Sequence, residues 1–474
     1  MLKYLYPNIR DNKIVKKMNQ FLYSNFYIIF INILMLLSYF FSIEIIIYYT
    51  YMLLGILIML LCDDMLPTVP MFCTGYMTIS KINSPITNAN SLLYSKTFLV
   101  NIVILGTITG AFLIARLVFE LKYNKKTTKP KLPFGFIIFT AVMVIGGVFT
   151  KYYGIKTILY GLLVGITLSF CYFYFFYTID FTKVRTNYIF YTFMIIGIAV
   201  GLELLDSYFS FDWGSVVFHR DQIYTGWGIR NNIGGIICTC IGAGFYLSTE
   251  KKHSVFYTLL GIVTYGLTIL SQSRNAIGVG LLLLIASLVV AFIYNDKRSR
   301  TKNLIIHLAH FFILLVIVLV YKDKIITIFI DIIEKGIDDN GRFVMYKNGL
   351  NAYKSSPIVG TGFFDYDHGI SVFFGKNSFL APRYHNTIIQ VMASTGTIGL
   401  IGYCYHRYET FKMFFKDCNK EKIFLAILLG AIIGTSLLDC QLFNFGPGLH
   451  YGTILVFMEC LPRKKSKEEE QLEQ

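Results

Sequence analysis

Long apolar runs recur along the whole chain and alternate with short polar segments. Most runs approach about 20 residues, the length that a helix needs to cross the hydrocarbon core of a bilayer. A helix also satisfies its own backbone hydrogen bonds, which lipid cannot do. The pattern therefore predicts an all-α fold, a polytopic bundle of transmembrane helices. The predicted spans are 21–41, 43–62, 98–119, 136–150, 158–178, 188–205, 232–249, 254–271, 276–294, 304–321, 388–405, 423–438 and 449–461.

The composition of the chain agrees with this prediction. Of the 474 residues, 55% are hydrophobic and 15% are charged, and a water-soluble fold of this length could not cover so much apolar surface. The net charge of +15 lies largely in short segments between spans, which indicates contact with membrane lipids rather than with nucleic acid. The cysteines are scattered, several of them inside spans, so no disulfide framework is predicted.

The basic segments predict which loops face the cytoplasm, because Lys and Arg are enriched on that side. These segments are 121–132, 296–302, 406–422 and 463–465. All of them can face the cytoplasm at once. The loops that then face outward are 205–231, 272–275, 322–387 and 439–448.

The amino-terminal end fits this scheme only if the chain crosses once more. Two spans within 21–62 would leave the basic segment 3–17 outside, against the positive-inside bias. The candidate for the extra crossing is Met65–Ser80, which Pro67 and Pro70 interrupt. Such a segment is tolerated only where protein surrounds it. We therefore expect about 12–14 spans and two cytoplasmic termini.

The spans and loops divide the chain into three parts. Residues 1–204 carry amino-terminal spans, and 205–410 form a core that contains the large extracytoplasmic loop 322–387. Residues 411–474 carry the last spans and a short charged tail. We find no soluble domain and no internal repeat of the kind that many transporters carry.

The large loop contains a predicted short helix, Arg342–Tyr353. Met345, Tyr346, Leu350 and Tyr353 are spaced to share an apolar side of that helix. Pro357, Gly360 and Gly362 follow it and prevent its continuation. We expect the segment to lie over the outer face of the bundle as a lid.

Arginines on the outward side are the candidate anion-binding residues. They are Arg220, Arg230, Arg274, Arg342 and Arg383. A single arginine at a membrane edge is equally well explained by snorkelling toward lipid headgroups. Several brought together would repel one another unless an anion lay between them. Guanidinium groups bind phosphate oxygens in pairs, so a diphosphate is the expected anion.

His385 is the candidate general base, because histidine titrates near neutrality and can accept a proton from a hydroxyl. The alternative is a structural role, which is commoner for a lone histidine. His219, His368 and His450 also face outward by this topology and are weaker candidates.

Neither a metal nor a cofactor is expected. The acidic pairs Asp63-Asp64 and Asp338-Asp339 lack a convincing third ligand, and solvated loop acids are the simpler explanation. A Gly-rich phosphate loop with a lysine is also missing from the sequence, so nucleotide hydrolysis is not expected.

Four separated segments together resemble the O-antigen ligase and polysaccharide polymerase superfamily. They are Gly228–Asn232, Ser273–Ala276, Gly341–Tyr346 with Pro357 and Gly360–Gly362, and His385–Asn386 with Gln390, Gly396 and Gly399. Each segment alone is a weak signal, and the order and spacing around one outer loop carry the resemblance. It covers roughly 220–410, whereas the first two hundred residues match only in hydropathy.

The resemblance implies a metal-independent, inverting glycosyl transfer at the outer membrane face. The donor would be a polyprenyl-diphosphate-linked oligosaccharide, and the acceptor a hydroxyl of another glycan. The implied roles are diphosphate binding for Arg274 and Arg342 with Arg230 or Arg220, a further contact from Arg383, and proton removal from the acceptor by His385. The sequence departs from the family pattern at Tyr346, where a tryptophan is expected.

Three functions fit these features. A polymerase joins lipid-linked repeat units, and a ligase moves a finished glycan onto another acceptor with the same donor chemistry. The Ile, Lys, Asn and Tyr content suggests an AT-rich genome and leans toward a capsule or wall polymerase, with a flippase and a chain-length regulator as expected partners. A transporter would need charges at mid-membrane depth, for which Glu203, near the outer end of its span, is the main candidate.

Overall fold

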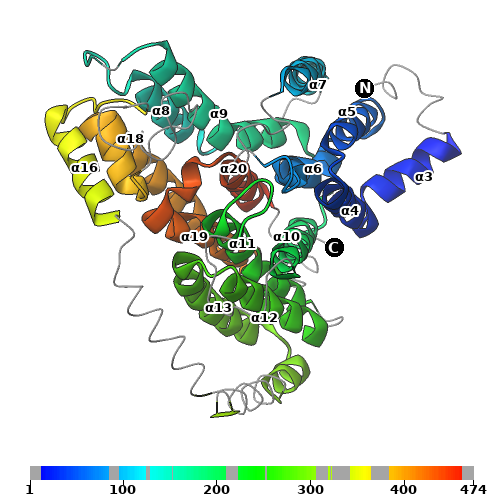
Figure 1. Ribbon diagram of the computed structural model, residues 1–474. Helices are drawn as coiled ribbons and strands as arrows, with labels where there is room; N and C mark the ends of the chain where they lie inside the picture. The colour runs from blue at the N-terminus through cyan, green and yellow to red at the C-terminus, as the bar shows by residue number, and fades with distance from the viewer. Residues whose placement is uncertain are drawn as a thin grey trace.

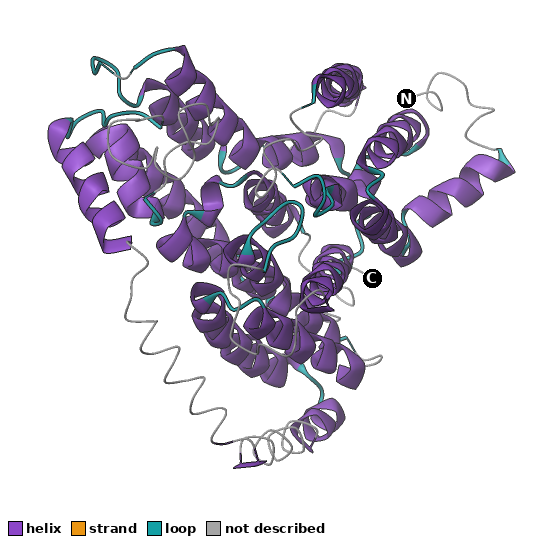
Figure 2. Ribbon diagram, in the orientation of Figure 1, coloured by secondary structure: helices purple, strands orange, loops and turns teal. Residues whose placement is uncertain are grey.

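The computed structural model describes residues 12–84, 95–123, 129–151, 153–209, 223–250, 254–305, 319–320, 322, 342–363 and 384–461. Within these ranges the chain forms helices joined by loops, and its β-structure is one isolated bridge between Tyr224 and Ile229 (Figure 2). Of the residues in these ranges, 81% are helical. The predicted all-α fold is confirmed.

The helices follow the predicted apolar runs closely. In chain order they are α3 (Lys13–Leu22), α4 (Asn25–Phe41), α5 (Glu44–Leu61), η1 (Leu66–Thr68), α6 (Val69–Thr74), η2 (Gly75–Thr78), α7 (Lys96–Tyr123), α8 (Pro133–Ile145), α9 (Ile155–Thr178), α10 (Tyr188–Phe209), α11 (Arg230–Ser248), α12 (Ser254–Leu270), α13 (Arg274–Tyr294), α16 (Arg342–Ser355), α18 (Thr387–Phe415), α19 (Lys420–Asp439), η6 (Gln441–Phe443) and α20 (Phe445–Cys460).

Seven of these helices are long and apolar enough to cross a membrane, or eight if the bent pair α3 and α4 forms one span. The chain is therefore a multi-pass membrane protein. The helices α8 and α12 are apolar but shorter. Most of the predicted span 304–321 lies outside the described ranges, so the total of about 12–14 spans stays a prediction.

Polar contacts gather one set of helix ends into a layer that we call the basic end, because the basic loops leave from it. These contacts join Met65 N to Thr178 O (3.1 Å), Arg185 Nη2 to Tyr23 O (2.8 Å), Lys131 N to Glu459 Oε1 (2.8 Å), Lys420 Nζ to Glu250 Oε1 (3.3 Å) and Asn303 Nδ2 to Ser254 Oγ (3.0 Å). The other helix ends form the opposite layer, which we call the site end. It includes the starts of α11, α13 and α18 and the finish of α19.

The interrupted segment Met65–Ser80 runs from the basic end to the site end beside α4. At its start, the Tyr23 hydroxyl donates to Asp64 Oδ1 (2.8 Å), and near its finish the Ser38 hydroxyl donates to the Thr78 carbonyl (2.6 Å). Most of its side chains are buried in the bundle. Protein therefore surrounds the backbone that Pro67 and Pro70 interrupt, as a membrane requires.

Asp64 corrects the expectation of solvated acids at this position. Its side chain is buried, and its carboxylate accepts hydrogen bonds from the Tyr23 hydroxyl and from the backbone N–H groups of Leu66 and Asp180. It joins the start of the interrupted segment to the turn between α3 and α4 and to the loop after α9. A buried carboxylate with all of these hydrogen-bond donors has a structural role, since it holds these segments together.

The predicted span 388–405 is helical, but α18 is broken at Gly396 (φ 65°, ψ −160°), a conformation that only glycine adopts readily. Before the break α18 packs on α16, where Gly349 lies against Ile389. After the break it packs on α8, where Gly402 faces Val142. Figure 1 shows α16 and α18 side by side at one edge of the bundle.

The segment 357–362 repairs this break. The N–H groups of Thr397 and Ile398 donate to the carbonyls of Pro357 and Ile358, at 2.8 and 3.2 Å. In return, the Ala393 and Ser394 carbonyls accept from residues 361 and 362, each at 2.8 Å. The hydrogen bonds that the helix loses at the break are thus replaced by others to a second segment.

We predict that Gly396→Ala destabilises the protein by about 2 kcal/mol or more, because a Cβ there would overlap the Ile358 carbonyl and the φ angle is strained for alanine. The measurement is the thermal unfolding midpoint of the detergent-solubilised protein. Gly278→Ala in α13 is the matched control, because its added Cβ meets open space. Equal unfolding midpoints for the two variants would contradict the helix break at Gly396 and its close contact with the segment 357–362.

Candidate active site

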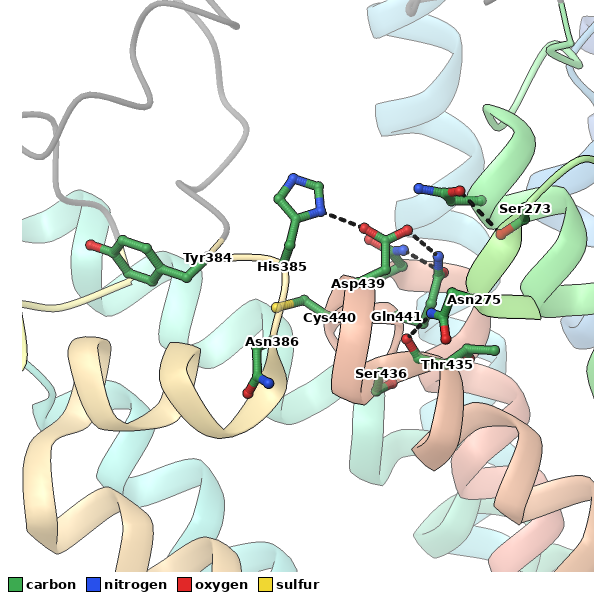
Figure 3. Close-up of polar contacts among 12 residues, drawn as sticks. Ser273, Asn275, Tyr384, His385, Asn386, Thr435, Ser436, Asp439, Cys440 and Gln441 are labelled. Atoms are coloured by element: carbon green, nitrogen blue, oxygen red, sulfur yellow. Dashed lines mark hydrogen bonds and ion pairs between the residues drawn. The ribbon is translucent and has the colours of Figure 1, made fainter. Parts of the chain in front are cut away.

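A histidine and an aspartate form a close pair at the site end. Nδ1 of His385 lies 2.6 Å from Oδ1 of Asp439 (Figure 3). The His385 side chain is 31% exposed, whereas that of Asp439 is 7% exposed. With Nδ1 turned to the carboxylate, Nε2 is the nitrogen that a substrate could reach. This is the arrangement of a general base oriented by a buried carboxylate.

The start of α18 is tied to the end of α19, and this contact sets the pair. The Asn386 side chain caps α18 by accepting from the Ile388 and Ile389 N–H groups (2.9 and 3.0 Å). The Asn386 amide also donates to the Leu437 carbonyl of α19 (2.8 Å). The Thr387 hydroxyl donates to the Ser436 carbonyl (2.9 Å). His385 directly precedes these residues and has a positive φ of 50°.

Asp439 is held through its second oxygen as well. The Gln441 amide donates to Asp439 Oδ2 (3.1 Å), and the Asn444 amide donates to Gln441 Oε1 (2.8 Å). All of these side chains are buried. Sequence reasoning missed Asp439. The available signal was an acid at the very end of an apolar run, at the edge of a loop predicted to face outward.

Two of the predicted arginines begin helices that converge on this pair. Arg230 is the first residue of α11 and Arg274 the first of α13, and both are partly buried. The two helix starts are joined by a hydrogen bond from the Ser273 hydroxyl to Asn231 Oδ1 (3.1 Å). A helix start carries partial positive charge, so each arginine reinforces a site for an anion.

These helix starts reach the end of α19 directly. The Asn275 amide donates to the Thr435 carbonyl (2.6 Å), one helical turn before Asp439. In α11, Gly235 faces the Gln441 side chain, whose nearest atom would lie 3.5 Å from an added Cβ. The starts of α11, α13 and α18 therefore surround the end of α19 (Figure 3).

The loop before Arg230 is anchored on distant parts of the chain. The Trp227 indole donates to Glu203 Oε2 (2.7 Å), and the Thr225 N–H donates to the Gly228 carbonyl (2.8 Å) to form a tight turn. Gly226 packs so closely against the Ile79 carbonyl that a side chain would overlap it. Glu203 is completely buried and serves as an anchor for this loop.

Arg342 begins α16, which packs on the first part of α18. The Tyr346 hydroxyl donates to the His385 carbonyl (3.4 Å). The residue that departs from the family pattern thus contacts the candidate base. The predicted apolar side of α16 was partly wrong, because Leu350 is 40% exposed and the packed face centres on Gly349 and Ala352. The small residues allow α16 and α18 to approach closely.

The remaining predicted site residues are either buried or not described. His450 is buried inside the bundle with Nε2 2.9 Å from the Cys73 carbonyl, so a substrate hydroxyl could not reach it. Arg220, Arg383, His219, His368 and the pair Asp338-Asp339 lie outside the described ranges. In the part of the chain that the structure describes, no group of three His, Cys, Asp or Glu side chains could hold a metal ion.

Residues 257–404 match the family model described as O-Antigen ligase. The matched stretch contains Arg274, Arg342 and His385, whereas Arg230 and Asp439 lie beyond its limits. A comparison with curated proteins finds no match to this chain. The family match confirms the resemblance to the O-antigen ligase and polymerase superfamily, and it contains three of the four sequence segments, whereas Gly228–Asn232 lies outside it.

We predict that neutral His385 carries its proton on Nδ1, because Asp439 accepts a hydrogen bond there. Selective ¹⁵N labelling of the eight histidines and NMR would report the tautomer, with the His385 signals assigned from a His385→Gln variant. Asp439→Ala should abolish the preference for Nδ1, whereas Asp63→Ala, at an exposed position of the basic end, should leave it unchanged. An unchanged tautomer in Asp439→Ala would show that the pair does not form.

Proposed function

We propose that this protein is a polysaccharide polymerase. It is a multi-pass membrane protein, and its residues 257–404 match a family of O-antigen ligase and polymerase-type glycan transferases. It transfers a glycan from a polyprenyl diphosphate to a hydroxyl of a second lipid-linked glycan. The observation that carries this proposal is the pair His385 and Asp439, at the point where the arginine-bearing helices α11 and α13 begin.

The distribution of basic residues supports a reaction outside the cytoplasm. The basic loops leave the bundle at the end opposite to His385, and the positive-inside bias assigns such loops to the cytoplasm. The first described helix begins at Lys13 and the last ends at Cys460, both at the basic end. On this orientation the termini are cytoplasmic, and the site faces the extracytoplasmic side with the predicted loop 322–387 above it.

The chemistry proposed for the site is a single displacement. Nε2 of His385 accepts the proton of the acceptor hydroxyl while Asp439 stabilises the imidazolium that forms. The acceptor oxygen forms a bond to the anomeric carbon as the bond from that carbon to the diphosphate oxygen breaks. Attack opposite the leaving group inverts the configuration. The proton on His385 then returns to solvent or to the released polyprenyl diphosphate.

The diphosphate gains negative charge as it leaves, and positive groups must stabilise it. Arg230 and Arg274 at the starts of α11 and α13, together with Arg342 of α16, are the groups assigned to this role. Fixed guanidinium groups and helix starts can provide this stabilisation without a divalent ion. Arg220 and Arg383 remain candidates for further contacts by resemblance alone.

A ligase is the second candidate, and the description of the matched family, O-Antigen ligase, favours it. It shares the donor site and differs only in its acceptor. A flippase that supplies the donor and a chain-length regulator are proposed partners of the polymerase. A transporter is less well supported, because Glu203 is engaged with Trp227 as an anchor.

The test is a reconstitution of the purified protein with a synthetic polyprenyl-diphosphate repeat unit, followed by gel analysis. A ladder of products supports the polymerase. One transfer that requires a separate acceptor supports the ligase. The absence of any product, with movement of the lipid-linked glycan across vesicles, would overturn the proposal in favour of a transporter.

In this assay we predict that His385→Ala lowers the transfer rate by about 10²–10⁴-fold, the usual contribution of a general base. The protein should still reach the membrane with an unchanged unfolding midpoint. Lys347→Ala, at an exposed position of the neighbouring helix α16, is the control and should retain activity. Normal chain growth in His385→Ala would remove this residue as the base.

We also predict that Arg274→Lys lowers the transfer rate by about 10–100-fold, because a point charge cannot replace a forked donor to a diphosphate. Arg298→Lys, at an exposed position of the basic end, is the matched control and should have wild-type activity. If Arg274→Lys were equally active, snorkelling toward lipid headgroups would be the better explanation of Arg274.

A further inference from the structure

A groove opens at the site end between the turn after α8 and the segment after α16. It encloses about 410 Å³, with residues 148–151 on one wall and Ser355, Ser356, Val359 and Thr361 on the other. This volume falls within the range of small-molecule sites. The groove lies away from the pair His385 and Asp439, and the proposed chemistry does not use it.

Backbone contacts fix the two walls of the groove against each other. The Gly147 N–H donates to the Val359 carbonyl (2.7 Å), and Gly147 has a φ of 83°. A Cβ on Gly147 would lie 2.7 Å from the Gly362 nitrogen, so only glycine permits this approach. The Tyr153 hydroxyl donates to the Val144 carbonyl (3.1 Å) and closes the turn. The groove is therefore largely preformed.

The lining combines polar groups with an exposed aromatic ring. Thr150, Ser355 and Ser356 supply hydroxyl groups, and Lys151 supplies an ammonium. Phe149 is 96% exposed and has a φ of 69°, an unfavourable conformation for a bulky residue. A sugar presents hydroxyl groups at its rim and C–H groups on its faces. Hydroxyls and an ammonium can bind the rim, and the Phe149 ring can pack on a face.

Helix α16 links this groove to the proposed base. Its Tyr346 hydroxyl donates to the His385 carbonyl (3.4 Å), and its last residue, Ser355, lines the groove. Nine residues of helix separate them, which is about 14 Å. An oligosaccharide can extend over such a distance, whereas one sugar unit cannot.

We propose that the groove binds the acceptor glycan several sugar units away from the hydroxyl that reacts at His385. This inference rests on the proposed glycan transfer and adds a second contact site for the acceptor. Its consequence is a dependence on acceptor length. Acceptors that reach both His385 and Phe149 bind more tightly than those that reach His385 alone.

The first experiment measures transfer to acceptors of graded length, prepared from the polysaccharide of the source organism. Phe149→Gly removes the ring and tolerates the positive φ, so it should fold normally. We expect KM for long acceptors to rise about tenfold, with kcat and the values for the shortest acceptor unchanged. Phe134→Ala is the matched control, because Phe134 is an aromatic residue that is 66% exposed in α8, the helix before the turn that carries Phe149.

The second experiment separates the groove from the chemistry. Labelled glycan fragments without a lipid are titrated into the His385→Ala protein, with and without Phe149→Gly. Weaker binding of long fragments in the double variant supports the groove, even if the wild-type protein transfers nothing and the proposed function fails. Wild-type transfer with no effect of Phe149→Gly on any acceptor overturns the groove and leaves the proposed function standing.

The groove could instead hold a lipid, and a further measurement distinguishes a bound lipid from a bound glycan. Native mass spectrometry of the same variants reports bound phospholipid. If Phe149→Gly loses phospholipid and its binding of glycan fragments is unchanged, the groove is a lipid site and the inference is overturned.

Discussion

The exchange of hydrogen bonds between α18 and the segment 357–362 is the constraint on which the site depends. A helix cannot be broken cheaply in an apolar environment, because each unpaired N–H or carbonyl group there costs several kcal/mol. Around Gly396 the two freed N–H groups and the two freed carbonyls are all paired with this second segment. The first part of α18 can therefore turn toward the end of α19, which brings His385 to Asp439, while the second part runs beside α8.

The same segment supports both proposed binding regions. Through Val359 it is joined to Gly147 in the turn after α8, and through Gly360–Gly362 it packs on α18 near the break. Helix α16 leads into it and contacts His385 through Tyr346. The proposed base and the groove thus share one framework of closely packed backbone. Three of its glycines, Gly147, Gly360 and Gly362, have positive φ angles, so their sequence positions are set by backbone geometry.

The sequence predicted much of this architecture and part of the site. Apolar runs located nearly all helices, and Arg230, Arg274 and His385 stood out because each lies where a span begins. Asp439 could not be found in this way, because its partner is 54 residues away in the chain and a terminal acid resembles any loop acid. The break at Gly396 also escaped prediction, since single glycines are common within transmembrane helices. Leu350 is exposed because Gly349, and not Leu350, faces Ile389 of α18, and helical spacing alone does not reveal this close approach.

The anchoring of the loop at Gly226 and Trp227 bears on which part of the chain is the smallest working unit. The stretch that matches the ligase family begins at residue 257, but the turn that leads to Arg230 rests on Ile79 and Glu203. The amino-terminal helices, which match no family motif, therefore position Arg230, a residue that we assign to donor binding. The matched stretch is a recognisable signature within the protein, and it is not a module that could be excised or exchanged between relatives with its function intact.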